Sequence, residues 1–74
     1  MNELNIFREN VKRELAVRGW STCYLARRTG YDKSTIRGIV GGYRSNSPKF
    51  VTMAHIAQAL ECSLSWLITD HTVS

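Results

Sequence analysis

Apolar residues recur along the first part of the chain at spacings of three and four, which places them on one face of an α-helix. This pattern predicts a helix running roughly from Glu3 to Arg18. Gly19 follows it and suits a left-handed C-terminal cap. The apolar face of this helix consists of Leu4, Phe7, Val11 and Leu15.

Two shorter helices are expected next, each marked by a capping residue and a glycine. Ser21 suits the N-cap of a helix from Thr22 to about Thr29, and Gly30 ends that helix because glycine adopts a positive φ at low cost. Asp32 is expected to cap a third helix from Lys33 to about Val40. A tight turn therefore joins two helices of about two turns each.

The third helix is followed by a polar stretch. Gly41 and Gly42 are expected to stop the helix, and the segment from Tyr43 to Pro48 is predicted to be a loop. A fourth helix should start between Pro48 and Val51. Its apolar face consists of Met53, Ile56, Ala57 and Leu60.

A short fifth helix closes the pattern. Ser63 suits its N-cap, and the helix should bury Trp66 or Leu67. Almost no stretch of the chain alternates with a period of two, so strands are not expected. The sequence therefore predicts an all-α five-helix domain over residues 1–70, with residues 71–74 as a flexible tail.

The positive charge of the chain is concentrated in one third of its length. The 74 residues carry a formal charge of +4, whereas residues 27–49 alone carry six basic residues against Asp32. Such a concentration indicates a polyanionic partner or, alternatively, a solvated basic face. The six basic residues are Arg27, Arg28, Lys33, Arg37, Arg44 and Lys49.

The segment from Thr22 to Gly42 has what two helices need to cross steeply over a tight turn. Leu25, Ile36 and Ile39 would supply a shared core, and Ala26 is small where the helices come closest. A pair built in this way can place its second helix in the major groove of DNA, which is about 12 Å wide.

Over residues 7–68 the chain resembles the Cro/repressor, or Xre-like, class of helix-turn-helix proteins. The resemblance implies a lambda-repressor-like five-helix bundle that binds double-stranded DNA. The sequence departs from the family at Thr22, where Gln is frequent, and at Gly38, where a longer side chain is frequent. Besides the helix-turn-helix, the resemblance rests on Phe7, Asn10, Val11, Lys12, Trp20, Ser21, Pro48, Met53, Ile56, Ala57, Ala59, Leu60, Ser63, Trp66 and Leu67.

The third helix carries the candidate base-reading residues. Lys33 and Arg37 place like charges at i and i+4, and Gly38 lies inside a helix, so both features cost stability. A helix pressed against DNA would gain from the charges, and glycine would let its backbone approach the bases. The alternatives are solvated charges and close helix packing at Gly38. The predicted base-reading stripe is Lys33, Ser34, Arg37 and Gly38, continuing to Gly41.

A second set of residues is expected to contact DNA phosphates. Thr22 stands at the start of the second helix, where backbone N–H groups attract an anion. The family resemblance implies that the loop after the third helix also grips the backbone. Arg27 and Arg28 face either solvent or a distant phosphate. The residues of that loop are Tyr43, Arg44, Asn46 and Lys49.

Other chemistry is not expected. Cys23 and Cys62 are interpreted as buried small hydrophobes without a disulfide. His55, expected to be half-buried, and His71, in the tail, have no second ligand at a metal-binding spacing. We therefore expect no metal, no cofactor, no small-molecule substrate and no enzymatic activity. No signal peptide or membrane span is indicated, which predicts a cytoplasmic, nucleoid-associated protein.

The leading functional prediction is a sequence-specific transcriptional regulator of the phage-repressor type, acting as a homodimer on a (pseudo)palindromic operator. The resemblance points loosely to the fifth helix, around Leu64, Trp66 and Ile68, as the dimer surface. Two alternatives stay open. The chain could be the N-terminal part of a longer repressor, or a protein-interaction module such as an antitoxin.

Overall fold

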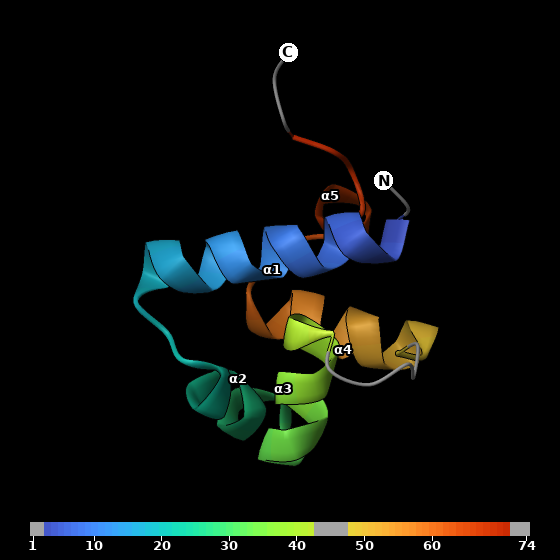
Figure 1. The fold of residues 1–74 in the computed structure, drawn as a ribbon. Coiled ribbons are helices and arrows are strands. Elements are labelled where there is room, and N and C mark those ends of the chain that lie inside the picture. The colour runs from blue at the N-terminus through green and yellow to red at the C-terminus, as the bar shows by residue number, and fades with distance from the viewer. Residues whose placement is uncertain (1–2, 43–47, 72–74) are drawn as a thin grey trace.

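The computed structural model describes residues 3–42 and 48–71, and every regular element in these ranges is a helix (Figure 1). The helices are α1 (Glu3–Arg18), α2 (Thr22–Thr29), α3 (Lys33–Gly41), α4 (Phe50–Ala59) and α5 (Leu64–Leu67). The all-α prediction is confirmed. The third helix extends through Gly41, one residue beyond the predicted end.

Capping explains most of the helix boundaries. The Ser21 hydroxyl accepts the Tyr24 N–H at 3.1 Å, and the Ser63 hydroxyl accepts the Trp66 N–H at 3.0 Å. Asp32 holds the N-cap position of α3, but the prediction that its side chain caps the helix is wrong. Its carboxylate instead accepts a hydrogen bond from the Ser34 hydroxyl. The helix keeps its boundary with no side-chain cap from Asp32.

The apolar faces predicted from the sequence meet in one core. Phe7 of α1, Leu25 of α2, Ile36 of α3 and Ile56 of α4 are completely buried. In α5 the buried residue is Leu67, whereas Trp66 is 37% exposed and its ring stacks on that of His71. The core therefore takes at least one anchor from each helix, although α5 has barely more than one turn.

Polar side chains of α1 bind the C-terminal carbonyls of three other helices. Arg8 Nε donates to Ile39 O of α3 at 2.8 Å, and Arg18 donates to Leu60 O after α4 at 2.6 Å. Asn10, only 3% exposed, donates to Leu67 O and Thr69 O, both at 2.8 Å. The last carbonyls of a helix lack intrahelical partners, so α1 satisfies groups that burial would otherwise penalise.

Three predictions about single side chains are wrong. Cys23 is exposed because the packing of α2 buries Leu25 and Ala26 but does not extend to Cys23, one turn before Ala26. Cys62 is half-buried rather than buried. His55 is exposed, and it hydrogen-bonds through Nδ1 to the Tyr31 hydroxyl at 2.7 Å.

Candidate nucleic-acid interface

The α2–α3 pair forms a helix-turn-helix at the end of the molecule opposite α5 (Figure 1). Gly30 makes the turn with φ of +80°, and its N–H donates to Ala26 O at 2.8 Å. The Thr29 hydroxyl donates to the carbonyls of Leu25 and Ala26. The end of α2 is thus closed by backbone and hydroxyl contacts, and the chain turns directly into α3.

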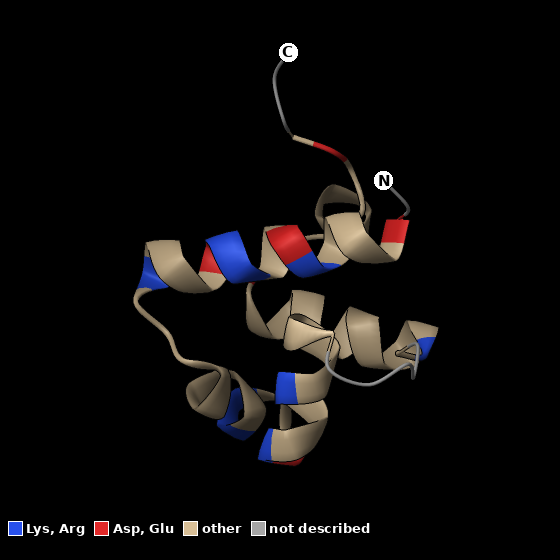
Figure 2. Cartoon of the chain, in the orientation of Figure 1, with Lys and Arg blue, Asp and Glu red and all other residues tan. Residues whose placement is uncertain are grey.

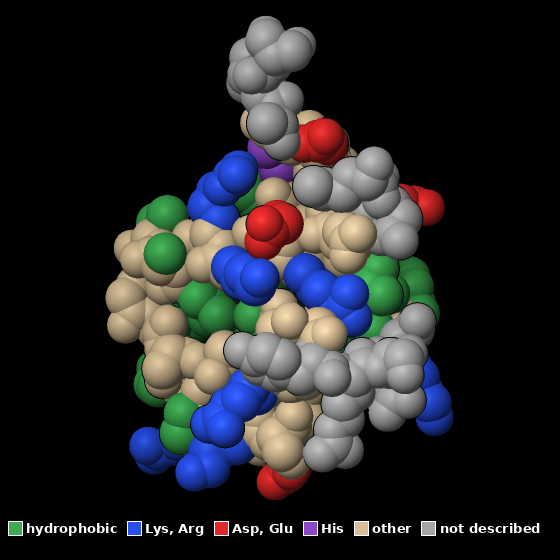
Figure 3. All heavy atoms as spheres, in the orientation of Figure 1, with side chains coloured by type: hydrophobic (Ala, Val, Ile, Leu, Met, Phe, Trp, Pro, Cys, Tyr) green, Lys and Arg blue, Asp and Glu red, His purple; other side chains and the backbone are tan. Residues whose placement is uncertain are grey.

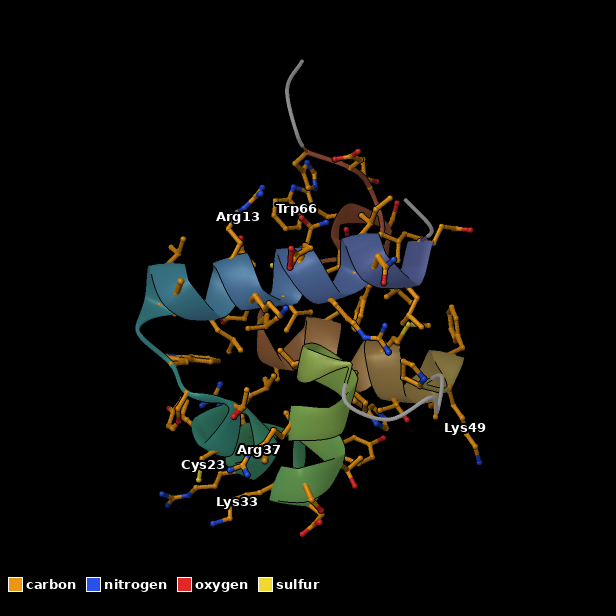
Figure 4. All side chains as sticks on the ribbon, in the orientation of Figure 1. Arg13, Cys23, Lys33, Arg37, Lys49 and Trp66 are labelled. Atoms are coloured by element: carbon orange, nitrogen blue, oxygen red, sulfur yellow. The ribbon has the colours of Figure 1, made fainter. Side chains whose placement is uncertain are left out.

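One side of α3 faces the core and the other faces solvent. Ile36 is completely buried and Ile39 is 8% exposed, whereas Lys33, Ser34 and Arg37 are exposed. Figure 4 shows Lys33 and Arg37 extending outward from α3 at the end of the bundle opposite Arg13 of α1. The structure therefore presents the three side chains of the predicted base-reading stripe on an accessible helix face.

Within the described residues, the packing around α3 does not require a glycine at position 38. A Cβ atom added there would meet no heavy atom of residues 3–42 and 48–71 within 4 Å, and the residue has no positive φ. The alternative of close helix packing at Gly38 is therefore wrong.

Basic side chains gather over the helix-turn-helix end of the molecule. Figure 2 shows Lys and Arg on α2 and α3 there, whereas α1 carries residues of both signs. The space-filling view shows the same concentration at the surface (Figure 3). An exposed helix with basic side chains, rigidly anchored on its inner face, is the shape expected of a major-groove reader.

A comparison with protein families decides the identity of this fold. Residues 10–71 match the model of the Cro/C1-type helix-turn-helix DNA-binding domain. The chain belongs to this family. The comparisons with curated proteins and with solved structures gave no significant match.

Membership of the Cro/C1-type family makes the protein a DNA-binding domain of the kind found in transcription regulators. Within residues 3–42 and 48–71, no helix is long and apolar enough to cross a membrane. The same residues contain no group of three or more side chains able to hold a metal ion.

The predicted phosphate contacts of this Cro/C1-type domain are only partly visible. Thr22 is half-buried at the first position of α2, and Lys49 is exposed at the N-cap position of α4. Figure 4 places Lys49 on a different element from Lys33 and Arg37, at the far end of α4. The remaining predicted contacts, Tyr43, Arg44 and Asn46, lie outside the described residues.

Sequence reasoning missed Arg8, which supports the end of the Cro/C1-type recognition helix. Besides its bond to Ile39 O, its guanidinium lies 3.4 Å from where a Cβ of Gly42 would be. Gly42 has φ of +68° and donates its N–H to Gly38 O. An arginine of α1 thus holds the point where the chain leaves α3. Nothing in the spacing of the sequence links two residues so far apart.

Arg28 makes a contact within the domain that the sequence did not predict. Its guanidinium lies over the ring of Trp20, 5.5 Å from the ring centroid. The Trp20 ring in turn makes an edge contact with Tyr24, with the centroids 4.8 Å apart. Arg28 therefore has an aromatic partner within the domain.

Proposed function

We propose that this protein is a sequence-specific transcriptional regulator, of the phage-repressor type, that inserts α3 into the major groove of its operator. The observation that carries the proposal is the two-sided character of α3. Ile36 and Ile39 fix its inner face in the core, and Lys33 and Arg37 project from its outer face. A helix fixed in this way presents its basic side chains in a constant geometry, which base reading requires.

The outer face of α3 supplies donors suited to base edges. Arg37 can bind O6 and N7 of guanine with two parallel hydrogen bonds, and Lys33 can donate to the same acceptors. Ser34 can accept or donate once its hydroxyl leaves the Asp32 carboxylate. Gly38 leaves space for bases to approach the helix backbone. We assign base reading to these four residues.

Phosphate contacts would fix the register of α3 on the duplex. Thr22 stands at the start of α2, where the helix dipole and backbone N–H groups favour an anion. We assign the remaining contacts to Lys49 and to Tyr43, Arg44 and Asn46, which precede it in the sequence. Such contacts position a protein without reading sequence.

A homodimer on a palindromic operator is the proposed working form, because a helix as short as α3 reads few base pairs. An apolar groove of about 350 Å³ supports a protein contact near α5. Phe50 at its edge is 73% exposed. The groove is lined by Glu3, Leu4, Pro48, Phe50, Met53, Leu64 and Ile68.

The same groove also favours the second candidate function, a protein-interaction module such as an antitoxin, because exposed apolar grooves fit protein partners. Sedimentation equilibrium of the wild type and Phe50→Glu separates the two. A wild-type dimer that Phe50→Glu dissociates supports the homodimer. A monomeric wild type would instead support a groove that binds a different protein.

Selection of bound sites from a random DNA pool tests the proposed function directly. We expect a palindromic consensus that persists when the selection is repeated at higher salt, because base contacts depend less on counterion release than phosphate contacts do. A regulator of this kind would act in the cytoplasm, at the nucleoid of a bacterial host. Recovery of DNA without any consensus would contradict sequence-specific reading by α3.

A further inference from the structure

A polar cleft lies where the end of α2 meets α4. Its volume is about 550 Å³. None of the four residues assigned to base reading lines it. Helix α2 packs against α3 and also against α4, and the cleft belongs to the α4 contact. The lining residues are Arg27, Arg28, Thr29, His55, Gln58 and Ala59.

The polar groups of this cleft favour an anion. Two arginines, one histidine and one glutamine line it, and no described residue contributes a carboxylate. Neither of the ion pairs within the described residues, Glu9–Lys12 and Glu14–Arg18, involves a cleft arginine. Guanidinium groups without a nearby carboxylate bind carboxylate or phosphate oxygens through paired hydrogen bonds.

Two of the cleft side chains are already oriented by aromatic neighbours. The Arg28 guanidinium lies over the Trp20 ring, which leaves the N–H groups at its edge able to bind a planar carboxylate. The Tyr31 hydroxyl can donate to Nδ1 of His55, in which case the imidazole N–H lies on Nε2. Oriented donors lose less entropy on binding than freely rotating ones.

The distribution of these groups determines what kind of anion fits. Arg27 and Arg28 are consecutive on α2, so their side chains leave the helix in different directions and do not converge on one oxyanion. Sites for small organic ligands are mostly apolar and enclose the ligand, whereas this cleft is polar. Separated cations along a polar cleft match carboxylates spaced along an extended chain.

We propose that the α2–α4 cleft binds an acidic segment of a partner protein. Carboxylates of that segment pair with Arg27 and Arg28, and His55 and Gln58 donate further hydrogen bonds. The complementarity of charge carries this assignment, since the charged side chains that line the cleft, Arg27 and Arg28, are both cationic and none of the lining residues is acidic. Its position on the α4 side of α2 leaves α3 accessible to DNA while the segment is bound.

The probe for the test is a short capped peptide of alternating Glu and Gly residues, titrated into ¹⁵N-labelled full-length protein. The control peptide has Gln in place of Glu. We expect the Glu peptide alone to shift the amide signals of Arg27, Thr29, His55 and Gln58. Shifts centred on Lys33 and Arg37 would overturn the proposal, because the peptide would then be a DNA mimic on α3.

Two variants separate a built site from a general effect of charge. Arg27→Gln should weaken peptide binding about tenfold, as expected for the loss of a charged hydrogen-bonded pair. Arg13→Gln removes the same charge from an exposed position on α1 and should leave peptide binding unchanged. Equal weakening by both variants would overturn the proposal.

Duplex DNA provides the last arm of the test. We expect Arg27→Gln to lower DNA affinity no more than Arg13→Gln does, because each variant removes one positive charge and neither changes the α3 face. If Arg27→Gln loses DNA affinity that Arg13→Gln retains, the cleft belongs to the DNA footprint and the acidic-segment proposal fails. The proposed function would survive that result, since it rests on α3.

Discussion

Some residues of α3 lower the stability of the free protein. Lys33 and Arg37 repel each other across one turn, and Gly38 lowers the stability of a helix in which it has no packing role. These costs are small, a few tenths of a kcal/mol for the charges and about 1 kcal/mol for the glycine. Binding of DNA by α3, as we propose, would offset these costs.

Replacing Gly38 by Ala tests whether this glycine has a packing role in α3. We expect the free energy of unfolding to rise by up to about 1 kcal/mol, because the added methyl group meets nothing and alanine favours the helix. Urea denaturation measures this change. The control Gly30→Ala should instead destabilise the protein by about 1–2 kcal/mol, because φ there is +80°. A destabilised Gly38→Ala variant would show that the packing argument is wrong.

Arg37→Ala tests the base-reading assignment. It should cost about 1–3 kcal/mol of binding at one base pair of the operator and relax the preference at that position. Binding to a panel of single-base operator variants measures this loss. Arg13→Ala, which removes an exposed arginine from α1, serves as the matched control. Equal weakening on every sequence would make Arg37 a phosphate contact.

The two cysteines should differ in reactivity. Burial, and then the Glu14 carboxylate, raise the pKa of the Cys62 thiol, whereas Cys23 is exposed. Because the thiolate is the reactive form, Cys23 should alkylate faster than Cys62 at mildly alkaline pH.

The same shift predicts a pH dependence of stability. Unfolding restores the ordinary pKa of Cys62, so above that pKa the unfolded chain releases its proton first and the free energy of unfolding falls as pH rises.

Mass spectrometry after a timed alkylation, with the unfolded protein as reference, tests the predicted difference in reactivity between Cys23 and Cys62. Equal rates in the folded protein would contradict the assigned burial of Cys62.

At the scale of elements, α1 is the organising helix of the bundle. Its apolar face enters the core, and its polar side chains bind carbonyls at the ends of α3, α4 and α5. These contacts join short helices. The shortest of the described helices, α5, spans only Leu64–Leu67. Short helices are unstable alone and depend on such tertiary contacts.

Asn10→Ala should be far more damaging than a change on the outer face of α1. It leaves the carbonyls of Leu67 and Thr69 without the amide that binds them, which should cost about 1–3 kcal/mol for a buried group. Chemical denaturation and hydrogen exchange in α5 measure the loss. Lys12→Ala, at an exposed position of α1, is the control. Comparable stability of the two variants would contradict the role of Asn10.

At the scale of the whole molecule, charge and shape act together. Basic residues are present on both helices of the helix-turn-helix, whereas α1 carries residues of both signs (Figures 2 and 3). The apolar groove is lined in part by Leu64 and Ile68, at α5. A protein with this arrangement can approach DNA through one end while a different surface stays accessible to another protein. Attraction between the basic end and DNA depends on salt through the release of counterions.

Lys49→Gln should reduce that salt dependence. The slope of log affinity against log salt concentration should fall by about one unit if Lys49 contacts a phosphate. Fluorescence anisotropy at several salt concentrations measures the slope. Lys12→Gln removes the same charge from α1 and should leave the slope unchanged. A slope unaltered by Lys49→Gln would remove this residue from the phosphate-binding set.

The helices and the residues of the core follow from local sequence patterns. Apolar spacing, Ser21, Ser63 and Gly30 act over a few residues, so their effects on α1, α2 and α5 could be predicted from local rules. The exposed face of α3 also followed, because Ile36 and Ile39 fix which side turns inward. The assignment of its outer residues to base reading remains a prediction.

Contacts between positions far apart in the sequence depend on the packing of the helices and could not be predicted from local patterns. The pairing of Arg8 with Ile39, the burial of Asn10 beneath α5 and the α2–α4 cleft depend on how helices pack, which periodicity does not encode. The exposure of Cys23 and His55 was missed for the same reason. Apolar spacing defines the face of a helix, but the neighbours of that face determine how far the burial extends.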